Sequence, residues 1–377
     1  MEIVIVGAGP AGCYTAQLLK KYGFKTRIIE EHREVGKPAR CAGLVGRQVF
    51  ENTLLPLSES SIINRIDGAS FLYGNDNFII KRERVAYVID RERFDKNVSQ
   101  GLNVECGKKV VGIKEGRTGY ILKTNEDDIY ADLVIGADGV RSQTRKYINF
   151  MWNNNGNNKK RDYVKCYLGM QYRIELEEDL PCSKIAQVYL REGISFFIWV
   201  IPEGDNIIRV GVISENARRD LAQFIKRFKI KGKIIGKLAG MIPVGLTKNY
   251  YKNIALVGDA AVQVKPLTGG GIFYGLKSAE LLAECIRDNR LNEYDRRLKR
   301  KFRKEIKFGL KARKFYEEIN KKELKNIFML FKKNAGFIEK VANFENHSVI
   351  FIEILKNPKI FRDARHILSR NIRKLLF

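Results

Sequence analysis

The sequence contains little histidine and comparatively few acidic side chains, and its cysteines follow no regular spacing. Among 377 residues there are three histidines and six cysteines, and no two cysteines form a Cys-x-x-Cys pair. A zinc site built on such pairs is therefore not predicted. With His32, His347 and His366 as the only histidines, the sequence also argues against a His-rich metal centre and a Ser-His-Asp hydrolase.

Long hydrophobic runs are absent as well. No segment approaches the roughly 18–20 apolar residues that a membrane-spanning helix needs. Met1-Glu2 leads directly into Ile3–Val6, unlike a secretory signal, so we expect a cytoplasmic protein. Apolar residues make up 45% of the chain and aromatic residues 10%, which excludes a disordered chain. The length favours two domains or one large composite.

The shortage of acidic residues leaves a large positive charge. There are 69 lysines and arginines against 43 aspartates and glutamates, a net charge of +26. Residues 296–377 hold 24 basic and eight acidic residues, so the last fifth of the chain carries most of the surplus. Nucleic acid, an anionic membrane and another acidic partner are all consistent with this charge. A lysine-rich or heat-adapted composition without a partner is the alternative.

A nucleotide-binding signature stands at the N-terminus. Residues 2–6 predict a buried parallel strand, the motif Gly7-Ala8-Gly9-Pro10-Ala11-Gly12 follows, and a helix is expected over residues 11–22. Gly7 permits a tight turn, Gly9 lets backbone amides approach a pyrophosphate, and Gly12 lets helix and strand pack closely. A second apolar run ends at Glu30, near the spacing of an acid that binds ribose hydroxyls. A dinucleotide site is predicted, but this motif alone does not separate NAD from FAD.

Two distant motifs extend this signature. Residues 131–142 predict an apolar strand that ends in a tight turn at Asp138-Gly139. Residues 254–257 predict another buried strand, and Gly258-Asp259, a glycine-rich loop and a helix over residues 273–287 follow it. A carboxylate at a strand end suits the hydroxyls of a sugar or ribitol chain. A helix N-terminus suits the electron-rich end of a flavin, which becomes anionic when reduced.

Together, the three motifs resemble those of the FAD-dependent oxidoreductases of the p-hydroxybenzoate hydroxylase type. The resemblance implies an α/β fold: a Rossmann-like FAD-binding domain, an antiparallel-sheet substrate domain and a helical C-terminal region. FAD is the implied cofactor, and no metal is expected. Asp259 would bind the ribitol, Asp138 would shape the nucleotide cleft, and Val110 would give backbone contacts to the adenine. The remaining implied contacts are Gly7, Gly9, Ala11, Gly12 and Glu30 for the ADP portion and Gly270, Gly271 and Ile272 for the flavin end.

Three further segments resemble the geranylgeranyl reductase family, which includes archaeal enzymes that saturate the isoprenoid chains of membrane lipids. Residues 34–46 carry the family's P-x-x-C-x-G loop, residues 86–95 its Arg-x-x-Phe-Asp segment, and residues 197–202 its Tyr-x-Trp-x-Phe-Pro motif. The implied FAD contacts are Arg40, Cys41, Ala42, Gly43 and Arg91, and the implied substrate contacts are Phe197, Trp199 and Pro202.

The sequence departs from this family in places. Phe197 replaces the motif's Tyr and Ile201 its Phe, Gly46 stands where many relatives have Ser, and the C-terminal region does not align. These departures leave the preferred lipid and its chain length open.

Several of these residues have a purely structural alternative. Arg40 and Arg91 could neutralise a pyrophosphate through charge-assisted hydrogen bonds or lie on solvated surface. The Cys41 thiol could donate a proton during catalysis or pack as a small hydrophobe. Phe196, Phe197 and Trp199 could line a tunnel for a polyisoprenoid or form the core of a sheet.

The chain is predicted to form three parts. The FAD-binding domain is assigned residues 1–60, 84–162 and 248–295, the substrate domain residues 61–83 and 163–247, and a basic helical region residues 296–377. Residues 152–162 are expected to form an exposed loop. Antiparallel strands are expected over residues 166–174, 186–190, 195–201 and 206–214.

Apolar residues of the C-terminal region recur at helical spacing. We expect the first set (Leu298, Phe302, Ile306 and Leu310) to pack on the FAD-binding domain. In the last set, arginines lie mostly away from the apolar stripe, which favours a helix in the headgroup plane of anionic lipid over protein packing. That stripe consists of Ile360, Ala364, Ile367, Leu368, Ile372 and Leu375.

The sequence and the resemblance therefore predict an FAD-dependent reductase of C=C bonds in geranylgeranyl chains, in archaeal-type membrane lipid biosynthesis. Hydride from reduced FAD and a proton would be added in a dry, apolar pocket. The alternatives are an FAD-dependent monooxygenase of the same fold and a non-catalytic basic lipid- or nucleic-acid-binding protein. No second Gly-x-Gly-x-x-Gly is present, so the electron donor is open among NAD(P)H, ferredoxin and others. A lipid substrate favours an anionic membrane over nucleic acid, hence a peripheral location at the inner membrane surface.

Overall fold

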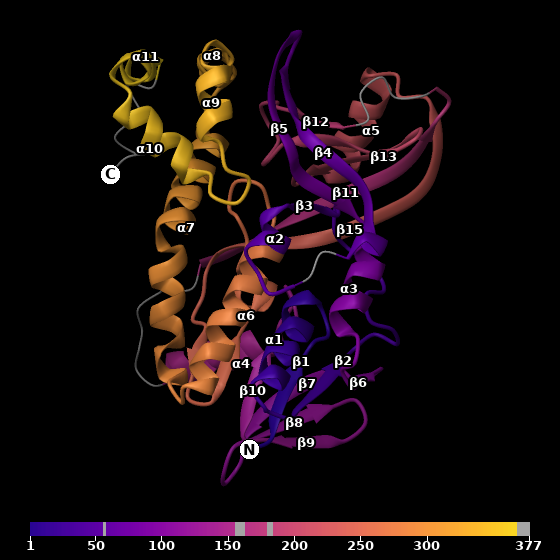
Figure 1. Cartoon of the computed structure of the whole chain (residues 1–377), viewed down its shortest axis with the longest axis vertical. Coiled ribbons are helices and arrows are strands. Elements are labelled where there is room, and N and C mark those ends of the chain that lie inside the picture. The colour runs from indigo at the N-terminus through magenta and orange to yellow at the C-terminus, as the bar shows by residue number, and fades with distance from the viewer. Residues whose placement is uncertain (56–57, 155–162, 179–183, 368–377) are drawn as a thin grey trace.

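Two large sheets, a small three-stranded sheet and a row of C-terminal helices are the main parts of the described chain (Figure 1). The computed structural model describes residues 1–55, 58–154, 163–178 and 184–367. A six-stranded sheet lies in the lower half of Figure 1, an eight-stranded sheet lies in the upper half, and the last helices run along one side of both.

The six-stranded sheet places the three sequence motifs at one edge. Its strand order is β16-β17-β10-β1-β2-β6, and every pairing except β16–β17 is parallel. The strands are short, rich in β-branched residues and mostly buried, as expected for a parallel sheet covered on both faces. Because the strands run parallel, the residues that follow β1, β2, β10 and β17 meet at the same edge. The strands are β1 (Ile3–Val6), β2 (Thr26–Glu30), β6 (Val104–Cys106), β10 (Leu133–Gly136), β16 (Tyr250–Tyr251) and β17 (Ile254–Leu256).

Helices cover one face of this sheet, and the small three-stranded sheet covers the other face together with helix α4 (Gln143–Asn154). Leu19, Leu276 and Leu282 belong to the core beneath the helices, and Val4 and Leu122 belong to the core beneath the small sheet. The elements are α1 (Pro10–Lys21), α3 (Arg91–Ser99), α4 (Gln143–Asn154), α6 (Ile272–Arg287), β7 (Val110–Glu115), β8 (Tyr120–Thr124) and β9 (Asp128–Ala131).

The prediction of an exposed loop over residues 152–162 is wrong for its first residues. Helix α4 continues through Trp152 to Asn154. Lys248 lies over the Trp152 ring, 4.1 Å from its centroid, so this last turn has a tertiary partner that the sequence did not indicate. Residues 155–162 lie outside the described residues.

The eight-stranded sheet has the order β15-β11-β14-β13-β12-β4-β5-β3. All its pairings are antiparallel except that of β12 with β4, which is parallel. These two strands are not joined by the short hairpin turn that would make neighbouring strands antiparallel. The strands are β3 (Leu44–Gly46), β4 (Ile62–Tyr73), β5 (Asp76–Ile89), β11 (Tyr163–Leu176), β12 (Ile185–Tyr189), β13 (Ile198–Gly204), β14 (Ile207–Ile213) and β15 (Gly232–Leu246).

Two features of this sheet were not predicted. The edge strand β15 is glycine- and lysine-rich and largely exposed, so its sequence carries only a weak alternating apolar pattern. The sheet also runs past the predicted domain boundary at residue 84, because β5 continues to Ile89 and pairs with β3. The division of the chain into domains stays a prediction.

The C-terminal region is helical as far as residue 367. Leu298, Phe302 and Ile306 are buried in the core beneath α1 and α6, so the first apolar stripe packs on that part as expected. The described helices are α7 (Tyr294–Glu318), α8 (Lys321–Lys333), α9 (Ala335–Val341), α10 (Ser348–Lys356) and α11 (Pro358–Ile367). The remaining helical segments are α2 (Gln48–Glu51), α5 (Ala217–Arg227), η1 (Glu59–Ser61), η2 (Gly258–Ala261) and η3 (Leu291–Glu293).

The last apolar stripe packs against protein where it is described. Ile360 and Ala364 are buried with Leu330 of α8 and Ile354 of α10. This favours the protein-packing alternative over the membrane helix for these two positions. The stripe residues beyond 367 lie outside the described part of the chain. Within the described residues, no helix is both long and apolar enough to cross a membrane.

Candidate functional site

The first glycine motif has the geometry that a pyrophosphate site needs. Gly7 adopts φ +104°, and a Cβ atom at Gly12 would collide with the carbonyl oxygen of Gly7. By contrast, a Cβ at Gly9 would meet nothing within 4 Å, so the space above the N-terminus of α1 is open. Ala11 packs on the second glycine motif, where a Cβ at Gly258 would lie 2.9 Å from the Ala11 Cβ. Both glycine motifs therefore lie side by side.

Glu30 ends β2 beside this motif. Its carboxylate accepts a hydrogen bond from the Ala8 amide (2.7 Å), and its other oxygen lies 2.5 Å from the His32 ring. The acid is thus held at the carboxyl edge of the sheet, within reach of the open space above Gly9. Val110 begins β7 and is buried in the core beneath the small sheet, so only its backbone could serve a ligand.

Asp138 follows β10, and its carboxylate finds its hydrogen-bond donors within its own turn. Its carboxylate accepts hydrogen bonds from the Ser142 hydroxyl (2.5 Å) and the Thr144 amide (3.1 Å). Burial raises its pKa, and these bonds oppose the rise. Arg145, in the same segment, donates to the carbonyl oxygens of Asp259 and Ala260. Arg145 therefore ties the segment after the Asp-Gly turn to the second glycine motif.

Asp259 is placed differently, because its carboxylate has no hydrogen-bond donor among the described residues. It follows β17, lines a large cavity, and lies 3.1 Å from where a Cβ at Gly271 would stand. Burial raises its pKa, against the charges of Arg91 and Arg145. Gly271 precedes the sixteen-residue helix α6, and Gly270 and Ile272 also line the cavity. An unpartnered acceptor beside a helix N-terminus fits a polyhydroxyl chain that leads to an electron-rich ring.

The predicted loop at residues 40–43 reaches the same cavity. Arg40, Cys41, Ala42 and Arg91 all line it, and Arg91 interacts with the side chains of both Asp95 and Cys41. The Gly43 amide donates to the Cys41 Sγ (3.4 Å). Arg91 is largely buried, with its side chain 13% exposed, whereas Arg40 borders the cavity but is exposed, so the solvated-surface alternative is excluded for Arg91 alone.

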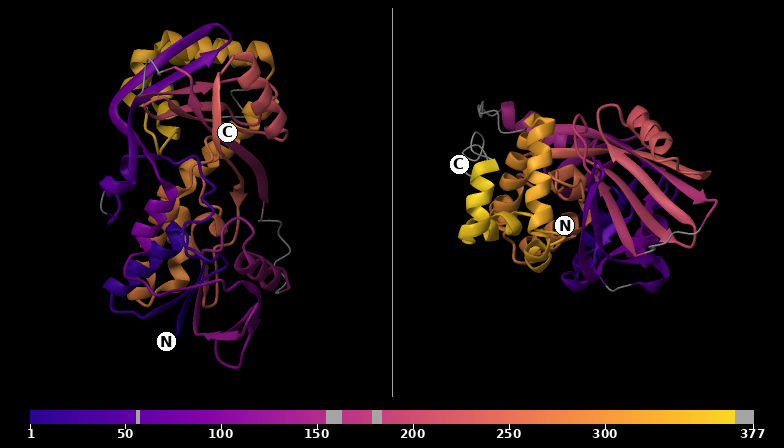
Figure 2. Two further views of the ribbon diagram at one scale, coloured as in Figure 1. Left: turned by 90° about the vertical axis from the view of Figure 1, so that its right-hand side faces the viewer. Right: turned by 90° about the horizontal axis from the view of Figure 1, so that it is seen from above.

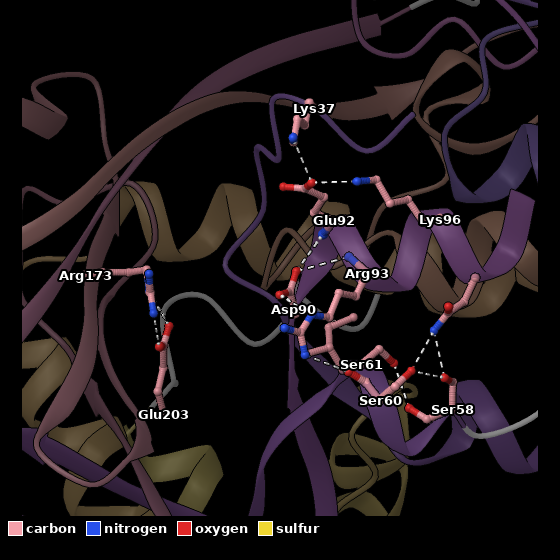
Figure 3. A network of polar contacts seen from close by, with 12 residues as sticks. Lys37, Ser58, Ser60, Ser61, Asp90, Glu92, Arg93, Lys96, Arg173 and Glu203 are labelled. Carbon is pink, nitrogen blue, oxygen red and sulfur yellow. Dashed lines mark hydrogen bonds and ion pairs between the residues drawn. The ribbon is translucent and has the colours of Figure 1, made fainter. Parts of the chain in front are cut away.

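A buried arginine that the sequence did not reveal fixes this loop. Arg209 donates to the carbonyl oxygen of Ala42 (2.6 Å) and forms an ion pair with Glu203, which also binds Arg173 (2.7 Å). A Cβ at Gly43 would collide with the Arg209 guanidinium, so glycine is required at this position. Figure 3 shows the Arg173–Glu203 pair and, apart from it in the view, the start of α3, where Asp90 caps the helix by accepting from the Glu92 and Arg93 amides.

The cavity has a volume of about 710 Å³ and a mostly apolar lining. Seen from above in Figure 2, the C-terminal helices stand on one side and the strands of the eight-stranded sheet on the other. Both supply lining residues, so the cavity extends from Asp259 and Gly271 to the C-terminal helices. The aromatic and aliphatic lining from these helices includes Ile319, Leu324, Ile327, Phe328, Phe331, Ile350, Phe351, Ile354 and Ala364.

Two of the three predicted substrate residues line this cavity. Phe197 and Trp199 are an edge-to-face pair with ring centroids 6.1 Å apart, and the Trp199 indole donates to Gln171 Oε1 (2.8 Å). Pro202 is buried elsewhere in β13 and is absent from the lining; its carbonyl accepts from Asn64 (3.1 Å). Trp199 is thus both cavity wall and sheet core, so the two alternatives for this motif coexist.

Two further buried cations border the cavity. Arg313 of α7 is 4% exposed and donates to the carbonyl oxygens of Pro266 (3.0 Å), Leu267 (2.6 Å) and Ser195. Lys265 is 4% exposed and pairs with Glu345 (2.9 Å). Both hold the loop that precedes Gly270. Neither of these two residues was identified from the sequence; the one signal for Lys265 was its position as a lysine inside an apolar segment next to a glycine motif. Within the described residues, no cluster of three or more His, Cys, Asp or Glu side chains could hold a metal ion.

Comparison with known proteins shows which proteins the whole chain resembles. The family described as FAD binding domain matches residues 1–49. An uncharacterized protein of Methanocaldococcus jannaschii is 29% identical, over 97% of this chain and 98% of its own. A digeranylgeranylglycerophospholipid reductase of Methanococcus vannielii is also 29% identical, over 86% of this chain and 89% of its own.

Solved structures show the same fold. A geranylgeranyl bacteriochlorophyll reductase-like protein from Thermoplasma acidophilum superposes with a TM-score of 0.78 at 23% identity, over 97% of this chain and 98% of that one. The p-nitrophenol 4-monooxygenase of Pseudomonas putida gives a TM-score of 0.68 at 17% identity, over 96% and 99% of the two chains. These matches confirm the fold class, FAD as the cofactor, and the resemblance to the geranylgeranyl reductase family.

Proposed function

We propose that the protein is an FAD-dependent reductase that saturates C=C bonds of geranylgeranyl chains in archaeal-type membrane lipids. The observation that carries the proposal is the apolar cavity of about 710 Å³ that begins at Asp259 and Gly271 and is bordered by the C-terminal helices. Its volume is in the range of ligand-binding pockets. Its lining suits a long hydrocarbon better than a polar substrate.

Each group in the cavity has a distinct part in this proposal. Bound FAD, when reduced, supplies the hydride. An isolated alkene is not electrophilic, so the apolar lining serves to exclude water and to hold the double bond close to the ring. Trp199, fixed by Gln171, is a rigid part of that wall. Cys41 lies on the wall beside Arg91 and is our candidate proton donor.

We further propose that the end formed by α8, α10 and α11 contacts an anionic membrane. Ile352 and Leu355 of α10 are each 43% exposed, and Met329 of α8 is 40% exposed. Exposed Lys356 and Lys359 flank them. Apolar side chains framed by lysines favour an anionic lipid surface. Binding to liposomes that is independent of anionic lipid content would contradict this proposal and support a merely lysine-rich composition.

The reductase proposal is tested anaerobically. The FAD-loaded protein is reduced, a digeranylgeranylglycerol phospholipid is added, and flavin absorbance and lipid mass are followed. We expect flavin reoxidation together with a mass gain of two hydrogens for each reduced bond. An absence of reoxidation without O₂, combined with rapid reaction in its presence, would instead support a monooxygenase.

The monooxygenase remains the second candidate because the fold is shared with p-nitrophenol 4-monooxygenase. It would need fast NAD(P)H oxidation and a polar aromatic substrate in a cavity that is largely apolar. A non-catalytic lipid- or nucleic-acid-binding protein would bind no FAD, so a purified protein that takes up no FAD would support that alternative.

A further inference from the structure

A buried ion pair stands beside the loop that leads into α6. The Lys265 ammonium forms an ion pair with Glu345 (2.9 Å), donates to the Phe344 carbonyl (2.8 Å), and lies over the Phe344 ring. The Lys265 and Glu345 side chains are 5% and 2% exposed. A Cβ at Gly270 would lie 3.4 Å from the Lys265 Nζ. The ammonium is therefore next to the backbone that precedes the N-terminus of α6.

The surrounding structure holds this pair tightly. A Cβ at Gly46 would lie 2.6 Å from the Phe344 ring and would collide with the Glu345 carboxylate. Tyr274 donates to the Glu345 carbonyl (2.8 Å). The absence of a side chain at Gly46 therefore makes room for Glu345.

Stability alone does not account for a buried ion pair. Removing two charges from water costs about as much as their attraction returns, so such pairs contribute little net stability. The loop after Glu345 provides no second cation, because His347 has its pKa lowered to about 3 by burial and by Lys265, and is neutral. Lys265 is thus the cation that lies nearest to Gly270 and borders the cavity.

The position of this lysine matters for a flavin. Asp259 offers an acceptor for the ribitol hydroxyls, and the N-terminus of α6 then faces the ring. The pyrimidine end of a flavin carries two carbonyl oxygens and takes up negative charge on reduction, when two electrons and one proton convert the neutral oxidised ring to the anionic reduced ring. A helix N-terminus and an ammonium both stabilise an anion at this place.

We propose that Lys265 stabilises the anionic reduced ring of bound FAD, and that Glu345 limits this effect by partly neutralising the lysine. The inference rests on the proposed FAD site and deepens it. Lys265 and Glu345 therefore have opposite effects on the reduction potential, although they belong to one ion pair. A purely structural role would not give opposite signs.

The test is an anaerobic reductive titration of FAD-loaded protein with dithionite at pH 7, against a reference dye. Lys265→Met should lower the midpoint potential, and Glu345→Gln should raise it. We expect at least a tenfold change in the ratio of reduced to oxidised flavin at a fixed potential, which is about 30 mV for a two-electron couple. Lys265→Arg keeps the charge and should restore most of the potential.

Lys332→Met is the matched control. Lys332 of α8 also pairs with an acid, Asp76 (2.7 Å), but does not line the cavity, so its variant should keep the wild-type potential. Shifts of the same sign in Lys265→Met and Glu345→Gln, or no shift in either, would overturn the inference. If Lys265→Met does not fold, Glu345→Gln alone still decides, because only a potential above that of the wild type supports the inference. A protein that takes up no FAD would refute the proposed function itself, whereas FAD binding with unchanged potentials would refute this inference alone.

Discussion

Replacing Arg313 with methionine tests whether the C-terminal helices hold the flavin-binding loop. The guanidinium is 4% exposed and donates to three backbone carbonyls, those of Pro266, Leu267 and Ser195. Methionine fills much of the same space with an unbranched apolar chain but donates no hydrogen bond. The variant thus removes the link between α7 and the loop that precedes Gly270.

The size of the effect follows from two opposing contributions. Each hydrogen bond from a charged donor contributes about 2 kcal/mol, so three contribute about 6 kcal/mol. Burial opposes this, because it lowers the pKa of Arg313 from 12.5 to about 10. A fall of that size corresponds to about 3 kcal/mol against the charged form. We therefore expect Arg313→Met to lower the free energy of unfolding by about 3 kcal/mol.

Urea unfolding and FAD titration measure the two consequences. The unfolding midpoint should fall in the apoprotein as well as in the FAD-loaded protein, and FAD should bind more weakly because its loop has lost an anchor. Lys314→Met is the matched control: Lys314 is the next residue on α7, its side chain is 78% exposed, and its loss should change stability by less than about 0.5 kcal/mol. Equal effects of the two variants, or a loss below about 1 kcal/mol in Arg313→Met, would refute the reasoning.

Three further predictions concern the site. Burial lowers the pKa of His347 from 6.5 to about 3. Because the unfolded chain binds this proton first as the pH falls, the free energy of unfolding should decrease between about pH 6.5 and pH 3, by up to about 1.4 kcal/mol per pH unit. In urea unfolding measured across this pH range, His347→Gln should flatten the decrease. Asp259→Ala should weaken FAD binding at least about tenfold, since a charged acceptor is lost, whereas the exposed Asp288→Ala should leave the FAD dissociation constant unchanged. Ala364→Phe should obstruct the cavity at α11 and raise KM for a twenty-carbon chain more than for a ten-carbon one; equal changes in both, or altered FAD affinity, would contradict the assigned position of the chain.

The cofactor half of the site could be predicted from the sequence. Gly7, Gly12 and Asp259 stand in motifs whose spacing follows from one turn between a strand and a helix, and each such turn is built from neighbours in the chain. The structure then places all three at one sheet edge because the strands before them are parallel. A nucleotide site at this edge could therefore be predicted before any tertiary contact was known.

The substrate half could be predicted only in part. The aromatic motif at Phe197 and Trp199 borders the cavity, but Pro202 does not. Strand β15 was missed because an exposed, lysine-rich edge strand lacks a clear apolar period. The end of α4 was taken for a loop because the cation–π contact of Trp152 with Lys248 joins residues nearly a hundred positions apart.

By itself the sequence determined the order of the motifs and the helical nature of the C-terminal region, because these depend on local spacing. The class of cofactor followed from the resemblance of the three motifs to those of FAD-dependent oxidoreductases. Only the tertiary structure decided what the C-terminal region does: it borders an apolar cavity, and it supplies Arg313 from α7 and Glu345 from the segment between α9 and α10 to the loop that precedes Gly270. Lys265 and Glu345 are 80 residues apart, and no periodic pattern connects them. Such a pair forms only because chain packing excludes water around both charges, which is a property of the folded molecule and not of either segment.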